Sequence, residues 1–301
     1  MHHLKRKERS VSTFCIFTPT YNRASTLPRL YESLVNQTYK DFTWLIIDDG
    51  STDDTRALIN QFAETDNIQI RYIKTRNQGK SRALNRAAAL CEDELFFCVD
   101  SDDWLPANSL ELLNAAWQEC KHDPNVAGIA ALKSLDGATP IGTNMPVATR
   151  TSNAWDLYNK WKFKGDAAFI FRSEVYSQYP SPIIPGEKFF SEGYVHYEIG
   201  KSYSLFLLDR IVYLAEYQDD GYSKNVRILA RNNPIGYTMA KRQCVELSKT
   251  PYQKLYNSIL YVVGSKLCND KNFIRNAPNR LYAIISIPFA LILLNTEFKP
   301  R

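Results

Sequence analysis

The sequence predicts an α/β fold in which a mostly parallel sheet is flanked by helices and followed by a helical C-terminal extension. Short apolar runs at residues 13–17, 42–47 and 95–99 each end in a polar loop. Strand patterns that alternate with helical patterns are typical of parallel sheets. The carboxyl ends of parallel strands form the edge where α/β folds bind ligands, so we expect the polar loops to meet there.

The first predicted strand, residues 13–17, leads through a loop at residues 18–23 into an amphipathic helix. Ser25 or Thr26 can cap this helix, and Pro28 stands in its first turn, where proline is tolerated. The apolar side chains that follow repeat at helical spacing, at Leu27, Leu30, Tyr31, Leu34 and Val35.

The second predicted strand, residues 42–47, is followed by an acidic loop and a helix from about residue 54 to residue 63. Gly50 permits a tight turn, and the helix can be capped by Ser51, Thr52 or Asp53. Asp48 and Asp49 lie too far before the first turn to cap it. They are therefore candidates for contact with a ligand.

A third strand is predicted at residues 68–73, and the loop after it is basic. Gly79 would let the backbone approach a ligand, and Lys80 and Arg82 bring positive charge to a helix N-terminus, where anions bind. An ordinary cationic surface loop is the alternative. The loop matches neither a Walker motif nor a dinucleotide fingerprint, which disfavours kinases and dehydrogenases.

Three carboxylates follow the apolar run at residues 95–99, at Asp100, Asp102 and Asp103. Hard oxygen ligands without a neighbouring His or Cys suit Mg²⁺ or Mn²⁺, and these ions keep positions open for substrate phosphates. A solvated turn that caps the next helix is the alternative. The cluster predicts a site for a metal-bound diphosphate.

Further strands are predicted at residues 126–132 and 211–215, and an irregular stretch lies between residues 135 and 153. Four motifs occur in order along the chain: FTPTYNR, IIDDGSTDDT, NQGKSRALN and CVDSDDW. In this order and spacing, they resemble the family-2 glycosyltransferases of the GT-A (Rossmann-like) fold, over roughly residues 11–225. The resemblance implies a nucleotide-sugar donor, usually UDP-linked, a divalent metal, Mn²⁺ or Mg²⁺, and inversion at the anomeric carbon.

The resemblance also implies a role for each matching residue of the donor site. A carboxylate can accept the imide N–H of uracil, and a metal can neutralise the departing diphosphate. Pro19, Thr20 and Tyr21 would line the uridine site, and Asp49 would accept a hydrogen bond from uracil. Arg82 would lie near the base or the diphosphate, and Asp100 would face the ribose. Asp102 would bind the metal, and Asp103 would help to hold the loop that carries Asp102.

Glu192 is the predicted catalytic base. It stands where many relatives carry a Glu-Asp pair, but Gly193 replaces the second acid here. An inverting displacement needs one carboxylate near the acceptor hydroxyl, although a glutamate in a first helical turn also has a purely structural explanation. Asp166 is the alternative base. Where relatives often have a histidine that completes the metal shell, this chain has Asp219 and Asp220, and Asp220 is the predicted second metal ligand.

Length and composition fit one catalytic domain plus an extension. The chain has 301 residues, 45% of them hydrophobic, so it can bury a large core. We expect a catalytic domain at residues 1–230, with a nucleotide-sugar half at about 11–125 and an acceptor half at about 126–230. The helical extension would then occupy residues 231–301.

Six scattered cysteines without a C-x-x-C pair indicate free thiols in a reducing compartment. The basic N-terminus lacks the apolar stretch of a signal peptide, so we expect the chain in the cytoplasm. No recognised module for nucleic-acid binding is present.

The C-terminal residues are helical and basic, and residues 281–294 carry no charge. That stretch is shorter than the roughly 18 residues of a spanning helix. It contains Pro288 and is bracketed by Arg280 and Lys299. The pattern favours a helix that lies on an anionic membrane surface, at the inner face of the cell membrane. Packing on the catalytic domain, or self-association, is the alternative.

Together these features predict a metal-dependent inverting glycosyltransferase. It would move a sugar from a UDP-sugar to a glycan or lipid-linked saccharide in the synthesis of surface polysaccharide. A nucleotidyltransferase would also use acidic loops and a metal, but the loop at residues 18–23 lacks the Gly-rich, basic character usual in that class. A non-catalytic module that binds nucleotide sugars or glycans is a further alternative, which would bind without turnover.

Overall fold

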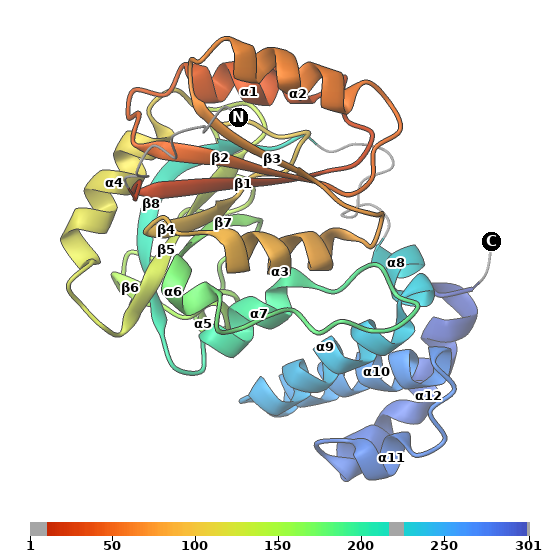
Figure 1. Cartoon of the computed structure of the whole chain (residues 1–301). Helices are drawn as coiled ribbons and strands as arrows, with labels where there is room; N and C mark the ends of the chain where they lie inside the picture. The colour runs from red at the N-terminus through yellow and green to blue at the C-terminus, as the bar shows by residue number, and fades with distance from the viewer. Residues whose placement is uncertain (1–10, 217–225, 300–301) are drawn as a thin grey trace. The chain divides into compact units, whose positions relative to one another are not determined.

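The computed structural model describes residues 11–216 and 226–299, and these form two compact units (Figure 1). The first unit contains the described residues up to 77, together with 83–179 and 199–216. The second contains residues 78–82, 180–198 and 226–299. Asp219 and Asp220 lie outside the described residues.

The first unit is built on an eight-stranded sheet in the order β3-β2-β1-β4-β7-β5-β8-β6. Strands β1 to β4 are parallel to one another, and β5 is parallel to β8. Between these two blocks lies β7, which is antiparallel to both of its neighbours, and β6 is antiparallel to β8. The predicted α/β fold with a mostly parallel sheet is confirmed. The strands are β1 (Phe14–Thr20), β2 (Phe42–Asp48), β3 (Gln69–Lys74), β4 (Leu95–Cys98), β5 (Val126–Ser134), β6 (Thr151–Ser152), β7 (Ala167–Arg172) and β8 (Ser204–Leu214).

Strand β1 is longer than the apolar run that predicts it, because it continues through Thr18, Pro19 and Thr20. These three residues pair with Ile46, Ile47 and Asp48 of β2, whereas the pairing of β1 with β4 ends at Phe17. Pro19 therefore has a neighbouring strand on one side only, and a proline without an N–H is tolerated in such a place. The extension carries the polar residues directly to the carboxyl edge of the sheet.

One face of the sheet is covered by α1 (Leu27–Val35), α2 (Thr55–Glu64) and α4 (Ser109–Cys120). Alternate residues of β1, Phe14 and Ile16, are buried against this face. The intervening residues point to the other face, where α3 (Lys80–Leu90) and α6 (Ser173–Tyr176) lie (Figure 1). There the ring of Phe17 stacks on Phe96, and Phe96 stacks on Tyr176. A short helix, α5 (Ala154–Asn159), follows β6.

The N-cap position of α1 is one of the two predicted, whereas that of α2 lies one residue after the predicted candidates. Thr26 is the N-cap residue of α1 and Asp54 that of α2, but neither side chain makes a capping hydrogen bond. The Asp53 carboxylate instead accepts from the N–H of Thr55 and from that of Ala24 in the preceding loop, each at 3.1 Å. Asp53 thus binds the first residue of α2 and also connects this turn to the loop after β1.

Strand β8 is much longer than the predicted run at residues 211–215. Asp209 and Arg210 stand in the middle of β8 and interrupt its apolar pattern after residues 205–208. Backbone pairing with β6 on one side and with β5 on the other forms the strand despite that composition.

The second unit is helical and has its own core. Its longest helices are α10 and α12, and α10 begins with a capping box in which Thr250 and Gln253 satisfy each other's backbone N–H. The core is formed by buried side chains such as Tyr261, Val262 and Phe273. The predicted C-terminal helices are therefore present. They are α8 (Val226–Asn232), α9 (Pro234–Leu247), α10 (Pro251–Leu267), α11 (Phe273–Asn276) and α12 (Arg280–Thr296), and α7 (Glu192–Ile199) lies earlier in the chain.

Candidate functional site

The loops that follow β1 and β2 are joined at the carboxyl edge of the sheet. The backbone N–H of Asp49 donates to the carbonyl of Thr20 at 2.8 Å. Asn22 adopts a left-handed conformation with φ of 52°, which lets its N–H donate to Ser51 Oγ at 2.9 Å while its side-chain oxygen accepts from Thr52. The two loops therefore form one fixed surface at this edge.

The adjacent carboxylates of Asp48 and Asp49 have different surroundings. Asp48 is fully buried, and its carboxylate accepts from the Ser51 N–H at 2.7 Å and from the Tyr72 hydroxyl at 2.5 Å. Burial and the Asp48 charge raise the pKa of Tyr72 well above its ordinary value, so the hydroxyl remains a donor. Asp48 therefore holds the turn that precedes α2, and it makes no capping bond to the helix itself. Asp49 stays the candidate for contact with the base.

Predicted uridine-site residues lie at the end of β1. Thr20 is buried, and its hydroxyl oxygen has no hydrogen-bond partner among the residues that the structure describes. Tyr21 is half exposed just beyond it. A buried hydroxyl without a partner and an exposed aromatic ring are suited to bind a planar polar ligand.

The acidic loop at residues 100–103 is anchored by hydrogen bonds to Tyr213 of β8. The Tyr213 hydroxyl donates to Asp103 Oδ2 at 2.7 Å and accepts from the backbone N–H of Asp100 at 3.0 Å. The other carboxylate oxygen of Asp103 accepts from the N–H of Glu216 at 2.9 Å. Asp103 is buried and serves the loop itself.

Arg29 of α1 fixes the same loop from the other side. Its guanidinium donates to the carbonyl of Asp102 at 2.5 Å, forms an ion pair with Glu216 and lies 3.8 Å from the centre of the Trp104 ring. The backbone of Trp104 also exchanges two hydrogen bonds with Leu214 of β8. Contacts to α1 and to β8 thus position Asp102 before any ligand binds.

Charges around the acidic loop are partly balanced by Lys133 of β5. The pKa of Asp103 is raised to about 6, mainly by burial and secondly by the neighbouring Asp100 charge. The hydrogen bonds that Asp103 accepts lower the pKa, but by less. Burial would lower the pKa of Lys133, but the carboxylates of Asp166, Asp100 and Asp103 outweigh that effect and raise it. The Lys133 ammonium lies 3.0 Å from Asp166 Oδ2 and 4.2 Å from the centre of the Tyr213 ring.

The acidic loop fits a hard divalent cation that shares its coordination with a substrate. Asp102 is partly exposed, while both oxygens of Asp103 are engaged by donors. Within the described part of the chain, the loop does not gather three acidic ligand atoms close together. Mg²⁺ and Mn²⁺ are commonly held by one or two carboxylates plus phosphates, so Asp102 with a bound diphosphate is a sufficient set.

In the second unit, the loop at residues 78–82 is bound to residues 187–190. Ser81 Oγ accepts from the N–H of Phe190 at 3.0 Å, and Arg82 donates to the carbonyls of Gln78 and Glu187 at 2.8 and 3.2 Å. Gly79 has φ of +93°, and a Cβ there would lie 1.9 Å from the Lys188 carbonyl. Glycine is therefore required for this backbone contact.

The two candidate bases both have cationic partners. Glu192, at the start of α7, forms an ion pair with Lys80 at 2.7 Å, and both side chains keep some exposure. Asp166, just before β7, pairs with Lys133 and is half exposed. The predicted metal ligand Asp220 is outside the described residues, so its role stays a prediction.

Sequence reasoning missed three residues that organise the site: Tyr213, Arg29 and Lys133. A single lysine in the otherwise apolar run of β5 is a signal that could have revealed Lys133, because a buried ammonium needs anionic neighbours. Tyr213 and Arg29 carry no such signal. Their partners lie far away in the sequence, and only the fold brings them together.

Comparison with protein families gives one match that covers more than half of the chain. The model described as "Glycosyl transferase family 2" matches residues 15–179. The chain is 37% identical over 97 residues to a chondroitin synthase of Escherichia coli, which covers 32% of this chain and 14% of that protein. It is 29% identical over 100 residues to the poly(ribitol-phosphate) beta-N-acetylglucosaminyltransferase TarS of Staphylococcus aureus, covering 33% and 18%. The chain thus spans less than a fifth of either relative.

Solved structures show the same fold at low sequence identity. The structure of S. aureus TarS residues 1–349 in complex with UDP-GlcNAc matches with a TM-score of 0.59 and 15% identity, over 96% of this chain and 93% of that one. A mannosyltransferase of Pyrobaculum calidifontis in complex with GDP-Man and Mn²⁺ matches with a TM-score of 0.56 and 18% identity, over 96% and 82%. These similarities support the GT-A fold.

Proposed function

We propose that this chain, which belongs to glycosyltransferase family 2, transfers a sugar from a UDP-sugar to a glycan or lipid-linked saccharide acceptor. The observation that carries the proposal is the arrangement of the acidic loop at residues 100–103. It lies at the carboxyl end of β4, beside the end of β1, and is fixed through Tyr213 and Arg29. This is the edge where parallel sheets bind nucleotides.

Most of the proposed donor-binding residues belong to the first unit, and Arg82 belongs to the second. Asp49 would accept the imide N–H of uracil, Thr20 and Tyr21 would contact the nucleoside, Asp100 would face the ribose, and Asp102 would bind Mn²⁺ or Mg²⁺. Bound there, the cation neutralises charge on the departing diphosphate. Because the loop is already fixed before the donor binds, no free energy would be needed to order Asp102 during the reaction.

The proposed chemistry is a single inverting displacement. The acceptor hydroxyl oxygen forms a bond to the anomeric carbon, the bond from that carbon to the diphosphate oxygen breaks, and UDP leaves with the electron pair. Glu192 would accept the hydroxyl proton. To do so, at least one carboxylate oxygen of Glu192 must leave the Lys80 ammonium and accept a hydrogen bond from the acceptor hydroxyl.

Purified full-length protein incubated with a panel of UDP-sugars, GDP-mannose and Mn²⁺ would test the proposal. We expect hydrolysis of one UDP-sugar to UDP, or its transfer to an added saccharide, and none for GDP-mannose. Release of pyrophosphate from nucleoside triphosphates would instead identify a nucleotidyltransferase. Tight UDP binding without turnover of any donor would identify a non-catalytic module.

We further propose that helix α12 places the enzyme on an anionic membrane surface. None of the helices in the described residues is long and apolar enough to cross a membrane. One face of α12 is nevertheless apolar and exposed, while Ala283, Ser286 and Ala290 face the core. Basic residues bracket the helix at Arg280 and Lys299. The exposed apolar side chains are Leu281, Ile284, Ile285, Phe289, Leu291 and Ile292.

The double substitution Ile284→Glu with Ile292→Glu tests this surface, because both side chains are at least half exposed and no core packing is lost. We expect wild-type protein to bind anionic vesicles at low salt and the double variant to remain in solution. The matched control is Val147→Glu, a fully exposed apolar residue of the first unit, which should bind like wild type. Absence of vesicle binding, together with a smaller oligomer in the variant, would assign the surface to self-association.

A further inference from the structure

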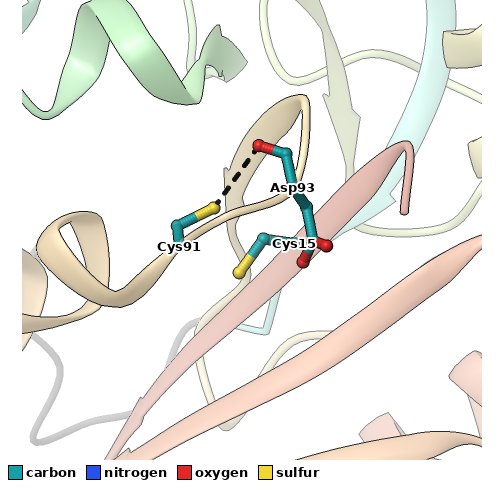
Figure 2. A group of neighbouring side chains, drawn as sticks. All are labelled: Cys15, Cys91 and Asp93. Carbon is teal, nitrogen blue, oxygen red and sulfur yellow. Dashed lines mark hydrogen bonds between the residues drawn. The ribbon is translucent and has the colours of Figure 1, made fainter. Parts of the chain in front are cut away.

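A second group of metal-ligating side chains lies at the amino end of the sheet, away from the acidic loops. Cys15 stands near the start of β1, Cys91 follows α3, and Asp93 precedes β4. One ligand atom from each residue lies within 4.8 Å of the other two, and within the described ranges 11–216 and 226–299 this is the only group of three such residues. Figure 2 shows the two sulfur atoms turned toward a common space, with the Asp93 carboxylate next to Cys15.

Secondary contacts orient these ligands. Asp93 Oδ1 accepts from the backbone N–H of Ser12 at 3.0 Å, and Cys91 Sγ lies 3.1 Å from Ser173 Oγ and 3.8 Å from the carbonyl of Asp93. Hydrogen bonds of this kind fix the direction of ligand side chains around metals. The three side chains come from segments held by the sheet, so their spacing is set by the fold.

The group is reachable by a cation, and its surroundings are acidic. Cys91 and Asp93 line an open cavity of about 410 Å³, whose other acidic residues are Glu92, Glu94 and Glu174. The one basic side chain in the lining, Arg172, donates to the carbonyls of Val126 and Lys121. Acidic clefts concentrate cations, so the cavity provides an entry path to Cys91 and Asp93, beside which Cys15 is buried.

We propose that Cys15, Cys91 and Asp93 bind a zinc ion. Two thiolates with one carboxylate select a thiophilic cation over Mg²⁺ or Mn²⁺, and zinc accepts S and O ligands in tetrahedral geometry. Two sulfur atoms bonded to one zinc ion lie about 3.8 Å apart, which the observed spacing permits with little movement. A water molecule from the adjacent cavity would supply the fourth ligand.

The ion would join strand β1 to the segment between α3 and β4. Both thiols lose their protons on binding, and these go to solvent. All six cysteines are free in the structure, so no disulfide competes for the sulfur atoms. The site lies at the opposite end of the strands from Asp102, so the ion would take no direct part in the proposed transfer reaction.

Co²⁺ can replace Zn²⁺, and its visible absorption depends on the ligands and geometry of the site, so a Co²⁺ titration tests the proposal. Reduced, metal-free full-length protein titrated with Co²⁺ should bind one ion with the absorption of a tetrahedral site and a thiolate charge-transfer band, and Zn²⁺ should abolish both. Cys91→Ser, at a partly exposed position, should weaken binding at least about 100-fold, more than the loss of an outer-shell contact. Two controls should keep the wild-type thiolate charge-transfer band and its titration midpoint: Cys120→Ser, which removes a cysteine of α4, and Asp102→Ala, which removes the acidic-loop ligand.

Protection of the wild-type thiols gives a readout that needs no variant. Zinc should slow alkylation of Cys91, located by peptide mass spectrometry, and leave Cys244 and Cys268 unaffected. Three outcomes would overturn the proposal: Co²⁺ spectra without a thiolate band, equal affinity in Cys91→Ser, or a Cys15–Cys91 disulfide that forms readily in the presence of zinc.

Discussion

Replacing Tyr213 with phenylalanine removes one oxygen atom from beneath the acidic loop and leaves the ring in place. That oxygen donates to the buried carboxylate of Asp103 at 2.7 Å and accepts from the backbone N–H of Asp100 at 3.0 Å. A buried polar group that loses its partner costs about 1–3 kcal/mol. The Asp100 N–H is nearer to solvent and can bind water, so the Asp103 oxygen accounts for most of the loss.

We therefore expect Tyr213→Phe to lower the free energy of unfolding by about 1–3 kcal/mol. Urea denaturation should show a lower midpoint with an unchanged slope, because the surface exposed on unfolding is the same. If the loop positions Asp102, metal-dependent transfer should fall as well, while binding of UDP without metal stays nearly constant. The matched control is Tyr252→Phe, which removes a hydroxyl from a side chain that is 77% exposed.

A double-mutant cycle with Asp103→Asn separates the hydrogen bond from other effects. If the two groups act through their shared bond, the combined loss of stability will be smaller than the sum of the single losses. Additive losses, or a Tyr213→Phe protein as stable as wild type, would refute the reasoning.

The remaining predictions concern the proposed donor site and base. Asp102→Ala should abolish Mn²⁺-dependent turnover and keep the fold, because the Arg29 contact uses the backbone carbonyl and survives; full activity would exclude the metal role. Asp49→Ala should weaken UDP binding with or without metal, and unchanged affinity would exclude contact with the base. Glu192→Gln should reduce transfer about 10²–10⁴-fold at nearly constant UDP affinity, whereas Lys80→Met, which removes the cationic partner of Glu192 and keeps its carboxylate, should reduce it much less. An equal loss of transfer activity in these two variants would show that Glu192 acts through its ion pair with Lys80.

Local patterns predicted the elements whose signal lies within a few residues. Apolar runs marked β1, β2 and β4, and helical spacing marked α1 and α10. Strands β6, β7 and β8 form by pairing between distant segments, and Asp209 and Arg210 interrupt the apolar pattern in the middle of β8. The order of the sheet, with β7 antiparallel between two parallel blocks, follows from these long-range pairs.

The same limit applies to the carboxylates of the site. Asp48 and Asp49 are identical in type and adjacent, and only the position of Tyr72 and of the Ser51 N–H decides that Asp48 is structural. Asp103 is likewise distinguished from Asp102 by Tyr213, which lies 110 positions further along the chain. Sequence patterns could identify the acidic loop, but the role of each of its aspartates depends on hydrogen-bond partners that only the fold brings close.

The anchoring of the acidic loop connects two parts of the sheet. The family match ends at residue 179, yet Tyr213, Leu214 and Glu216, which hold residues 100–104, all lie after it. Strand β8 also pairs with β5 and β6, in the part of the sequence predicted to bind the acceptor. A change that shifts β8 would therefore move Tyr213 relative to Asp103 and alter the position of Asp102. Substitutions in β5 or β6 that leave every donor contact intact should still change the apparent affinity for the metal, because the strand they displace carries the support of the loop.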